Sequence, residues 1–287
     1  MKTGIGLPNA IPGVAGSVLV EWARRAEERG FSSLATLDRV AYPSYDSLVA
    51  LAAAGAVTER IGLMTNILLA PTRNPILLAK EAASVDQVSG GRLILGLGVG
   101  TRTDDFVASE RGFEDRGRRF ERDLELIQGA WRGELVGGCP KPPTPRPVRG
   151  HIPILVGGTA DAVIRRVVRW GTGWTAGGGA ADVVGPFAHR VRAAWEAAGR
   201  QGRPRIVALS YFSMDADAVE ESKRTILDYY EYLGPPAQGF ADSIPRGATA
   251  VRDTVKRFEE AGVDELVLDP AVPDLAEVDL LADTLDL

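Results

Sequence analysis

The hydrophobic residues of this chain fall into short uninterrupted runs, separated by longer stretches with helical periodicity. Uninterrupted apolar runs are typical of parallel strands that helices cover on both faces. The intervening stretches are amphipathic; in residues 115–131, for example, Phe120, Leu124 and Ile127 lie on one helical face. The pattern therefore predicts strands and helices in alternation, which favours a parallel sheet.

Eight apolar runs are present, and a helical stretch follows each of them. We expect strands to begin near residues 2, 32, 61, 92, 152, 172, 205 and 264. The helices that follow the first and second strands are expected to begin near residues 17 and 44. Those that follow the fourth to the eighth strand are expected to begin near residues 115, 159, 181, 215 and 275, and a further helix is expected at 249–261. Eight such units in about 250 residues predict a (β/α)8 TIM barrel with loop insertions at its carboxyl-terminal face. A doubly wound open sheet is the alternative, but the composition does not divide into two blocks.

Several segments do not fit regular elements. Residues 65–74 form an irregular passage after the third strand, on the rim where α/β barrels place their chemistry. Residues 101–110 are predicted to be a polar loop. Residues 139–151 contain five prolines, which exclude a helix or a central strand. We expect this Pro-rich loop to be a lid or wall of the site rather than a linker, and residues 234–245 to shape the same pocket.

Composition narrows the possible functions. A net charge of -5 and a pI of about 5.3 give no indication of nucleic acid or a membrane surface as a partner. The single cysteine, Cys139, excludes an internal disulfide and a cysteine-rich metal site. No apolar run reaches transmembrane length and no secretory signal is visible at the N-terminus, so we expect a cytoplasmic protein.

The residues at the expected carboxyl ends of the strands are rich in glycine and poor in histidine, cysteine and carboxylates. Neither a normal metal-ligand set nor a Ser-His-Asp triad can be built from them. These strand ends are residues 7–9, 38–39, 65–67, 98–101, 157–159, 175–179, 211–213 and 269–270. The pattern favours a large flat organic cofactor that is held mainly by backbone contacts and brings its own reactivity.

Two glycine-rich turns are candidates for binding a phosphate. Gly157, Gly158 and Thr159 lie between a strand and a helix, where free N–H groups attract an anion. Gly177 and Gly178 lie in the neighbouring turn and leave room for a ligand. An ordinary strand-to-helix turn would explain the first three residues equally well.

Three polar residues are candidates for catalysis: Asp38, Thr101 and Asp104. Asp38 ends the second strand and either caps a turn or faces the ring of the ligand. Asp104 is followed by Asp105. Each is either a solvent-exposed loop carboxylate or a catalytic acid, and we prefer the first interpretation. Thr101 ends the fourth strand.

The run TNILLAPTRNPILLAKEAASVDQVSGGRLILGLGVG, residues 65–100, resembles the characteristic segment of the bacterial luciferase-like family of flavin-dependent oxidoreductases. That family has an Arg-x-Pro motif before a helix, which is matched here by Arg73 and Pro75. A Ser-Gly-Gly-Arg turn and a Leu-Gly-x-Gly-x-Gly strand follow. The strand end at 157–159 and the segment 170–174 also match, so the resemblance covers nearly the whole chain.

The resemblance implies a single TIM-barrel domain, residues 1–287, that holds the deazaflavin F420 or reduced FMN at its carboxyl-terminal face. It also implies a non-prolyl cis peptide at Asn66–Ile67 that supports the cofactor ring, a phosphate on the turn at 157–159, and a contact between Asp38 and the ring. The residues expected to bind the cofactor are Pro8, Asp38, Thr65, Asn66, Ile67, Gly157, Gly158, Thr159, Gly177 and Gly178.

Two positions depart from the family pattern. Arg39 stands where many members have histidine, and Thr101 stands where several F420-dependent dehydrogenases have glutamate. The usual groups that handle protons are therefore missing, and the sequence does not identify a proton donor.

We expect hydride transfer between F420, preferred over FMN, and a small organic substrate. One alternative is an FMN-dependent monooxygenase that uses O2, and another is a flavin-binding partner subunit without catalysis of its own. A barrel hydrolase or isomerase without flavin would lack the necessary acid/base cluster. A homodimer and a separate flavin or F420 reductase are the expected protein partners.

Overall fold

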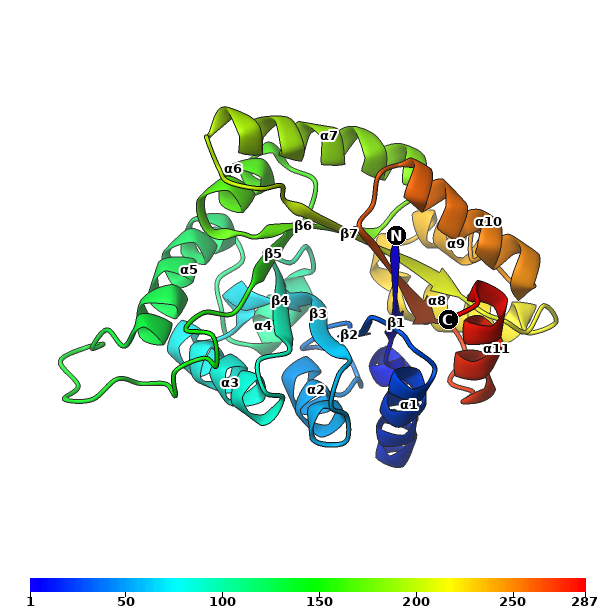
Figure 1. The fold of residues 1–287 in the computed structure, drawn as a ribbon, viewed down its shortest axis with the longest axis horizontal. Helices are drawn as coiled ribbons and strands as arrows, with labels where there is room; N and C mark the ends of the chain where they lie inside the picture. Colours follow the sequence, from blue (N-terminus) through cyan, green and yellow to red (C-terminus); the bar gives the residue numbers. More distant parts are fainter.

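Each strand pairs in parallel with the next along the chain, and the eighth pairs with the first, which closes the barrel (Figure 1). The computed structural model describes residues 1–287. The strands are β1 (Lys2–Gly6), β2 (Ser33–Thr36), β3 (Gly62–Leu69), β4 (Leu93–Gly98), β5 (Ile154–Gly157), β6 (Gly173–Gly178), β7 (Arg205–Phe212) and β8 (Glu265–Pro270). The predicted (β/α)8 barrel is confirmed, and every strand begins within two residues of its expected position.

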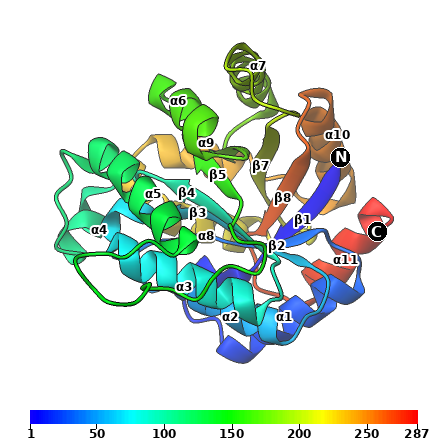
Figure 2. The ribbon, with the colours of Figure 1, turned by 60° about the vertical axis from the view of Figure 1, so that its left-hand side comes forward.

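Helices surround the barrel, as Figure 2 shows. Eight of them alternate with the strands. Side chains that the sequence supplies for capping fix where some of them begin. The carboxylate of Asp46 and the amide oxygen of Asn74 accept hydrogen bonds from the first free N–H groups of two helices. The surrounding helices are α1 (Gly16–Glu28), α2 (Ser47–Ala56), α3 (Pro75–Val88), α5 (Arg116–Arg132), α6 (Asp161–Trp170), α7 (Ala181–Ala197), α10 (Gly247–Glu260) and α11 (Ala276–Leu285).

The core has two parts, as expected for a barrel whose strands are covered on both faces. Small and medium apolar side chains fill the barrel interior: Ala35, Met64, Leu155, Val207 and Val267. A larger cluster lies between the strands and the helices and includes the fully buried side chains of Trp22, Trp131 and Trp174. No helix is both long enough and apolar enough to cross a membrane.

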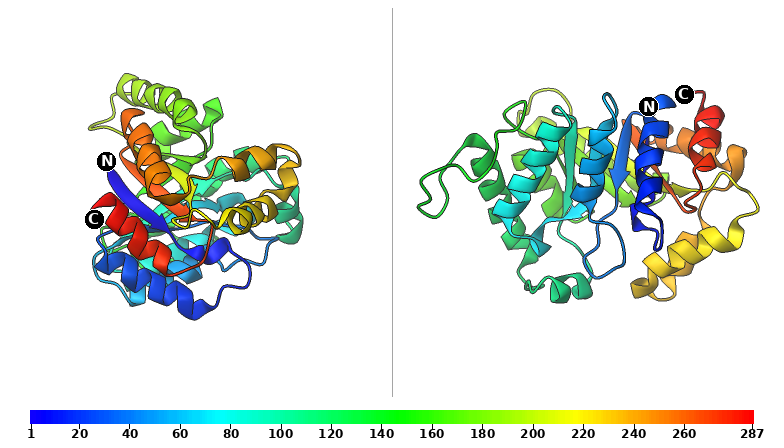
Figure 3. Two further views of the ribbon diagram at one scale, coloured as in Figure 1. Left: turned by 90° about the vertical axis from the view of Figure 1, so that its right-hand side faces the viewer. Right: turned by 90° about the horizontal axis from the view of Figure 1, so that it is seen from below.

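Additional elements lie at the carboxyl-terminal end of the barrel. The short helix α4 (Thr103–Ala108) lies between β4 and α5, while α8 (Val219–Tyr229), η3 (Glu231–Leu233) and α9 (Pro236–Asp242) lie between β7 and α10. Two single 3-10 turns, η1 (Pro8–Ala10) and η2 (Ala70–Thr72), follow β1 and β3. Figure 3 shows α4 and α8 projecting from the same end of the barrel, opposite to the N-terminus.

Three predictions of local structure were wrong. Residues 101–110 contain α4, which the sequence pattern misses because it has only six residues and buries a single aromatic ring, Phe106. The irregular passage predicted from residue 65 is strand as far as Leu69, with a shift in register between Thr65 and Leu68. The helix expected from residue 215 begins at Val219, and the Pro-Pro pair after it opens α9.

The Pro-rich loop, residues 139–151, was wrongly predicted to cover the active site. It connects the end of α5 to the start of β5, and loops that lead from helix to strand lie at the amino-terminal end of a barrel. Its contacts agree with this position. The backbone N–H of Val148 donates to Asp86 at 2.8 Å, and the side chain of Gln87 donates to the carbonyl of Arg146 at 2.6 Å, both near the end of α3.

Candidate active site

A cavity of about 260 Å³ opens at the carboxyl-terminal ends of the strands, between α4 and the end of α8. Strand ends form its floor and one wall, and three tyrosines from α8 and η3 form the opposite wall. The lining residues are Leu37, Asp38, Arg39, Asn66, Ile67, Leu69, Val99, Gly100, Thr101, Arg102, Asp105, Gly157, Gly158, Gly177, Gly178, Leu209, Tyr229, Tyr230 and Tyr232. This is the rim at which TIM-barrel enzymes carry out their chemistry.

The floor of the cavity is formed by Asn66 and Ile67. The peptide bond between them is cis, as the family resemblance implies. A Cβ atom added to Gly98 would overlap the Ile67 side chain, and one on Gly157 would lie 2.9 Å from it. These glycines of β4 and β5 therefore leave the space that Ile67 occupies. Packing against Ile67 therefore explains why the Leu-Gly-x-Gly-x-Gly strand has glycine at position 98.

Asn66 presents an unused hydrogen-bond donor at this floor. Its side-chain oxygen accepts a hydrogen bond from the hydroxyl of Thr175 at 2.6 Å, which fixes the orientation of the amide group. Its Nδ2 atom is buried and has no partner in the protein. Because a buried polar group without a partner is costly, this donor fits a ligand with an acceptor above the floor.

The two glycine-rich segments belong to neighbouring strands. The first is the turn from β5 into α6, while Gly177 and Gly178, expected in a turn, are the last two residues of β6. The backbone N–H groups of Gly158, Thr159 and Ala160 donate to no protein atom, so the start of α6 has free donors for an anion. Gly158 has φ +110°, a conformation that glycine adopts readily. The indole N–H of Trp174 donates to the Gly158 carbonyl at 2.7 Å and holds the turn in place.

The carboxylate of Asp38 lines the cavity but is already occupied by the protein. It accepts hydrogen bonds from the backbone N–H of Leu69 at 2.9 Å and from Arg73 at 2.8 Å. Burial raises the pKa of Asp38, and the adjacent Arg73 offsets only part of that rise. These contacts tie the end of β2 to the turn after β3, and this gives Asp38 a positioning role.

Arg39 is fixed by a buried ion pair that the sequence did not predict. Its Nε atom donates to both carboxylate oxygens of Asp105, at 3.1 and 3.0 Å, and Asp105 is fully buried. The backbone N–H groups of Val40 and Ala41 donate to the same carboxylate at 2.9 and 2.8 Å. Asp105 therefore holds the loop after β2 and keeps the guanidinium in place. Sequence analysis noted this aspartate only as the neighbour of Asp104.

The tyrosine wall, which consists of Tyr229, Tyr230 and Tyr232, was also missed by sequence analysis. Tyr229 and Tyr230 pack edge to face with ring centroids 5.1 Å apart, and Tyr230 stacks on Phe240 at 5.0 Å. The guanidinium of Arg102 lies 4.1 Å from the centre of the Tyr232 ring. Arg102 also donates to the Tyr229 carbonyl at 3.1 Å, so it links the β4–α4 loop to the wall. The sequence signal was the cluster YYEY at a helix end.

Most of the predicted site residues come together in this cavity. Those that line it are Asp38, Asn66, Ile67, Thr101, Gly157, Gly158, Gly177 and Gly178. Thr159 is exposed at the edge of its turn. Pro8 is buried in η1, and the hydroxyl of Thr65 donates to the Gly96 carbonyl at 2.8 Å within the barrel wall.

Asp104 does not line the cavity either. Its side chain is 45% exposed and pairs with Arg102 at 2.8 Å and with Arg39 at 3.2 Å. Its hydrogen bond with Arg102 is the main reason that its pKa is lowered. A carboxylate held in its ionised form is poorly suited to act as an acid.

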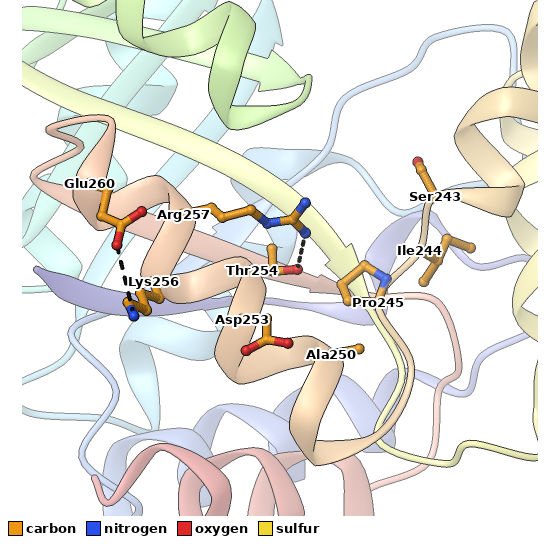
Figure 4. A pocket seen from close by; sticks show the side chains of 9 residues that line it. All are labelled: Ser243, Ile244, Pro245, Ala250, Asp253, Thr254, Lys256, Arg257 and Glu260. Atoms are coloured by element: carbon orange, nitrogen blue, oxygen red, sulfur yellow. Dashed lines mark hydrogen bonds and ion pairs between the residues drawn. The ribbon is translucent and has the colours of Figure 1, made fainter.

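A second, larger depression is lined by α10 and the segment 243–245 that precedes it, and has a volume of about 640 Å³ (Figure 4). Three of its four charged side chains bond to neighbours on the same helix. Lys256 pairs with Glu260 at 4.0 Å, and Arg257 donates to the hydroxyl of Thr254 at 3.1 Å. No group of three or more His, Cys, Asp or Glu side chains could hold a metal ion here or elsewhere in the structure.

Comparison with known proteins agrees with the fold and with the sequence motifs. The family model described as luciferase-like monooxygenase matches residues 1–268. An uncharacterized protein of Mycobacterium tuberculosis is 32% identical over 227 residues, which are 69% of this chain and 78% of that protein. The F420-dependent glucose-6-phosphate dehydrogenase of Gordonia bronchialis is 31% identical over 129 residues, which are 41% of this chain and 38% of that enzyme.

A solved structure shares the fold over its whole length. The monooxygenase RslO1 of Streptomyces bottropensis superposes with a TM-score of 0.82 at 23% identity, covering 99% of this chain and 98% of that one. The family match covers most of the chain and includes the strand ends that form the cavity. The protein therefore belongs to the luciferase-like monooxygenase family of oxidoreductases.

Proposed function

We propose that this protein transfers a hydride between the deazaflavin F420 and a small organic molecule. The observation that carries the proposal is the cavity itself, which combines a firm floor at Asn66–Ile67 with a glycine-rich turn before α6 and a glycine-rich end of β6. Similarity to the F420-dependent glucose-6-phosphate dehydrogenase supports F420 as the cofactor.

The residues present fit such a cofactor. The unpartnered Nδ2 atom of Asn66 is a donor for a ring carbonyl, and the free N–H groups at 158–160 are donors for a phosphate. A Cβ atom added to Gly177 would meet no atom within 4 Å, so this end of β6 is open to a ligand. When bound, F420 supplies the carbon that accepts or gives the hydride. The protein binds and orients the ring and excludes water.

A second candidate function is monooxygenation with reduced FMN and O2. The family description and the similarity to RslO1 favour this candidate, because both are named as monooxygenases. A flavin-binding partner subunit without its own catalysis would use the same turns and floor. Binding alone therefore does not distinguish it from an enzyme, and turnover must be measured.

The test is a titration of the purified protein with F420, FMN and reduced FMN, followed by fluorescence. We expect F420 to bind with a stoichiometry of one per chain and FMN to bind much more weakly. Binding of reduced FMN together with substrate-dependent oxygen uptake would favour the monooxygenase. Binding of neither cofactor would contradict both assignments.

The phosphate-binding turn is tested by the variant Gly158→Asp. We expect F420 to bind at least about fivefold more weakly, because two like charges a few ångströms apart repel by roughly 1–4 kcal/mol near a protein surface. Gly138→Asp is the control for an aspartate at a glycine of positive φ, since Gly138 lies in the loop at the opposite end of the barrel. A Cβ atom on Gly138 would meet no atom within 4 Å, whereas one on Gly158 would lie 3.2 Å from Val163. Equal affinity in the two variants would show that the phosphate does not lie on this turn.

A further inference from the structure

The hydroxyl group of Tyr229 is a polar group on the tyrosine wall that the protein leaves free. Its oxygen makes no hydrogen bond to the protein and is not among the polar atoms sealed from solvent, although the residue lines the cavity. The other tyrosines differ. The hydroxyls of Tyr230 and Tyr211 bond to each other at 3.0 Å, and the ring of Tyr232 is 43% exposed at the mouth.

The Tyr229 ring is held firmly at the end of α8. It packs edge to face against Tyr230 on one side and against Tyr42, at 5.5 Å, on another. The guanidinium of Arg39 lies 5.7 Å from its centre, and Arg102 bonds to its backbone carbonyl. A hydroxyl with these supports has a fixed position, as a group that acts on a bound ligand requires.

The charged groups around the cavity are already paired. Arg39 pairs with Asp105, Arg102 with Asp104, and Asp38 with Arg73, so each of these charges already has a counter-charge in the protein. The Nη1 atom of Arg39 is the one nitrogen of this guanidinium that is buried without a hydrogen-bond partner. The remaining lining is largely apolar. The cavity therefore fits an uncharged molecule with an apolar body and one oxygen that can bond to Tyr229.

We propose that Tyr229 is a catalytic residue that donates its hydroxyl proton to the oxygen of a neutral carbonyl substrate. This inference rests on the F420 reaction proposed above. Burial raises the pKa of Tyr229 well above 10, so the hydroxyl remains a donor at neutral pH. It supplies the proton donor that the sequence, with Arg39 and Thr101 at the usual positions, does not provide.

The atoms and electrons of this step balance. A hydride from reduced F420 forms a C–H bond at the carbonyl carbon, while the electron pair of the C=O π bond moves to oxygen and takes the Tyr229 proton. The carbonyl is reduced to an alcohol by two electrons, and F420 is oxidised by two. The proton that F420 also loses passes to water, and water reprotonates the tyrosine. Alcohol oxidation is the reverse.

The test compares two ligands of nearly the same shape, acetophenone and α-methylstyrene, which has a methylene group in place of the carbonyl oxygen. Binding to the protein without cofactor is measured by ligand-observed NMR. We expect the unmodified protein to bind acetophenone about two- to tenfold more tightly, the effect of one typical hydrogen bond. Tyr229→Phe should bind the two ligands equally. It should also unfold at the same urea concentration, because no hydrogen bond within the protein is lost.

Tyr45→Phe is the matched control. The Tyr45 hydroxyl bonds to the carbonyl of Val14 at 2.7 Å outside the cavity, so this variant should keep the preference for acetophenone. A preference that persists in Tyr229→Phe, or that is absent from the unmodified protein, would overturn the inference. If F420 does not bind but the preference for acetophenone over α-methylstyrene still depends on Tyr229, the hydride reaction is overturned. The contact between Tyr229 and the carbonyl oxygen is then supported.

Discussion

At the scale of single residues, Asp38 contributes through the contacts that it makes within the protein. Replacing it by asparagine would remove the charge that faces Arg73 and place an amide near other donors. We expect Asp38→Asn to lower the free energy of unfolding by about 1.5–3 kcal/mol, the range for hydrogen bonds to charged groups. Urea denaturation measures this change.

Asp46→Asn is the comparison, since Asp46 pairs with the same arginine at 2.9 Å but is partly exposed. Asparagine also caps a helix well, so this variant should lose less than about 1 kcal/mol. Equal losses in the two variants would show that burial of Asp38 does not strengthen its interaction with Arg73.

The sequence predicted some of these residues and missed others for a physical reason. Asn66, Ile67 and the glycines lie in local motifs at strand ends, and the topology alone brings strand ends together. Arg39 and Asp105 are 66 residues apart in the chain. The tyrosines of the wall are close in sequence, but they reach the cavity only through the position of α8 above the barrel. Their contacts depend on how α4 and α8 fold over the barrel, and no local pattern encodes that.

At the scale of elements, the entry to α8 is held by a buried carboxylate on α11. Glu277 accepts hydrogen bonds from the backbone N–H groups of Met214 at 2.7 Å and Asp215 at 3.3 Å. Burial raises its pKa to about 7 from an ordinary value of 4.5. Between these pH values the folded protein keeps a proton that the unfolded chain has lost. The contribution of Glu277 to stability is therefore greatest below pH 4.5 and falls as the pH rises to about 7.

Glu277→Gln removes this titration and keeps an oxygen that can accept one N–H group. Between about pH 5 and pH 8, we expect the free energy of unfolding of the unmodified protein to fall by roughly 2–3 kcal/mol relative to that of this variant. Urea unfolding at the two pH values measures the difference. Glu260→Gln, which changes an exposed glutamate on α10, should show no such trend. If the free energies of unfolding of Glu277→Gln and the unmodified protein differ by the same amount at both pH values, the pKa of Glu277 is not raised in the folded state.

The elements that the sequence missed share a property. Long helices and buried strands have enough apolar positions to show a period, and all eight strands were found. The short helix α4 and the Pro-opened α9 have few such positions, and both fold against the carboxyl-terminal end of a barrel that already exists. Their conformation therefore follows from tertiary contacts.

At the scale of the whole molecule, the barrel separates function at one end from stability at the other. The Pro-rich loop tests this separation, because sequence analysis placed it at the site and the structure places it at the amino-terminal end. Residues 137–142 are exposed and can be replaced by a Gly-Ser segment of the same length. The loop contacts made by Thr144, Arg146 and Val148 would remain.

We expect this replacement to leave the affinity for F420 unchanged within about twofold. It should change the free energy of unfolding by less than about 1 kcal/mol, since an equal loop length keeps the entropy of closure similar and no buried contact is lost. The measurements are the fluorescence titration and urea denaturation already described. A marked loss of F420 affinity with unchanged stability would contradict the separation of the loop from the cavity. Weaker binding together with lower stability would instead show that the two ends of the barrel are coupled.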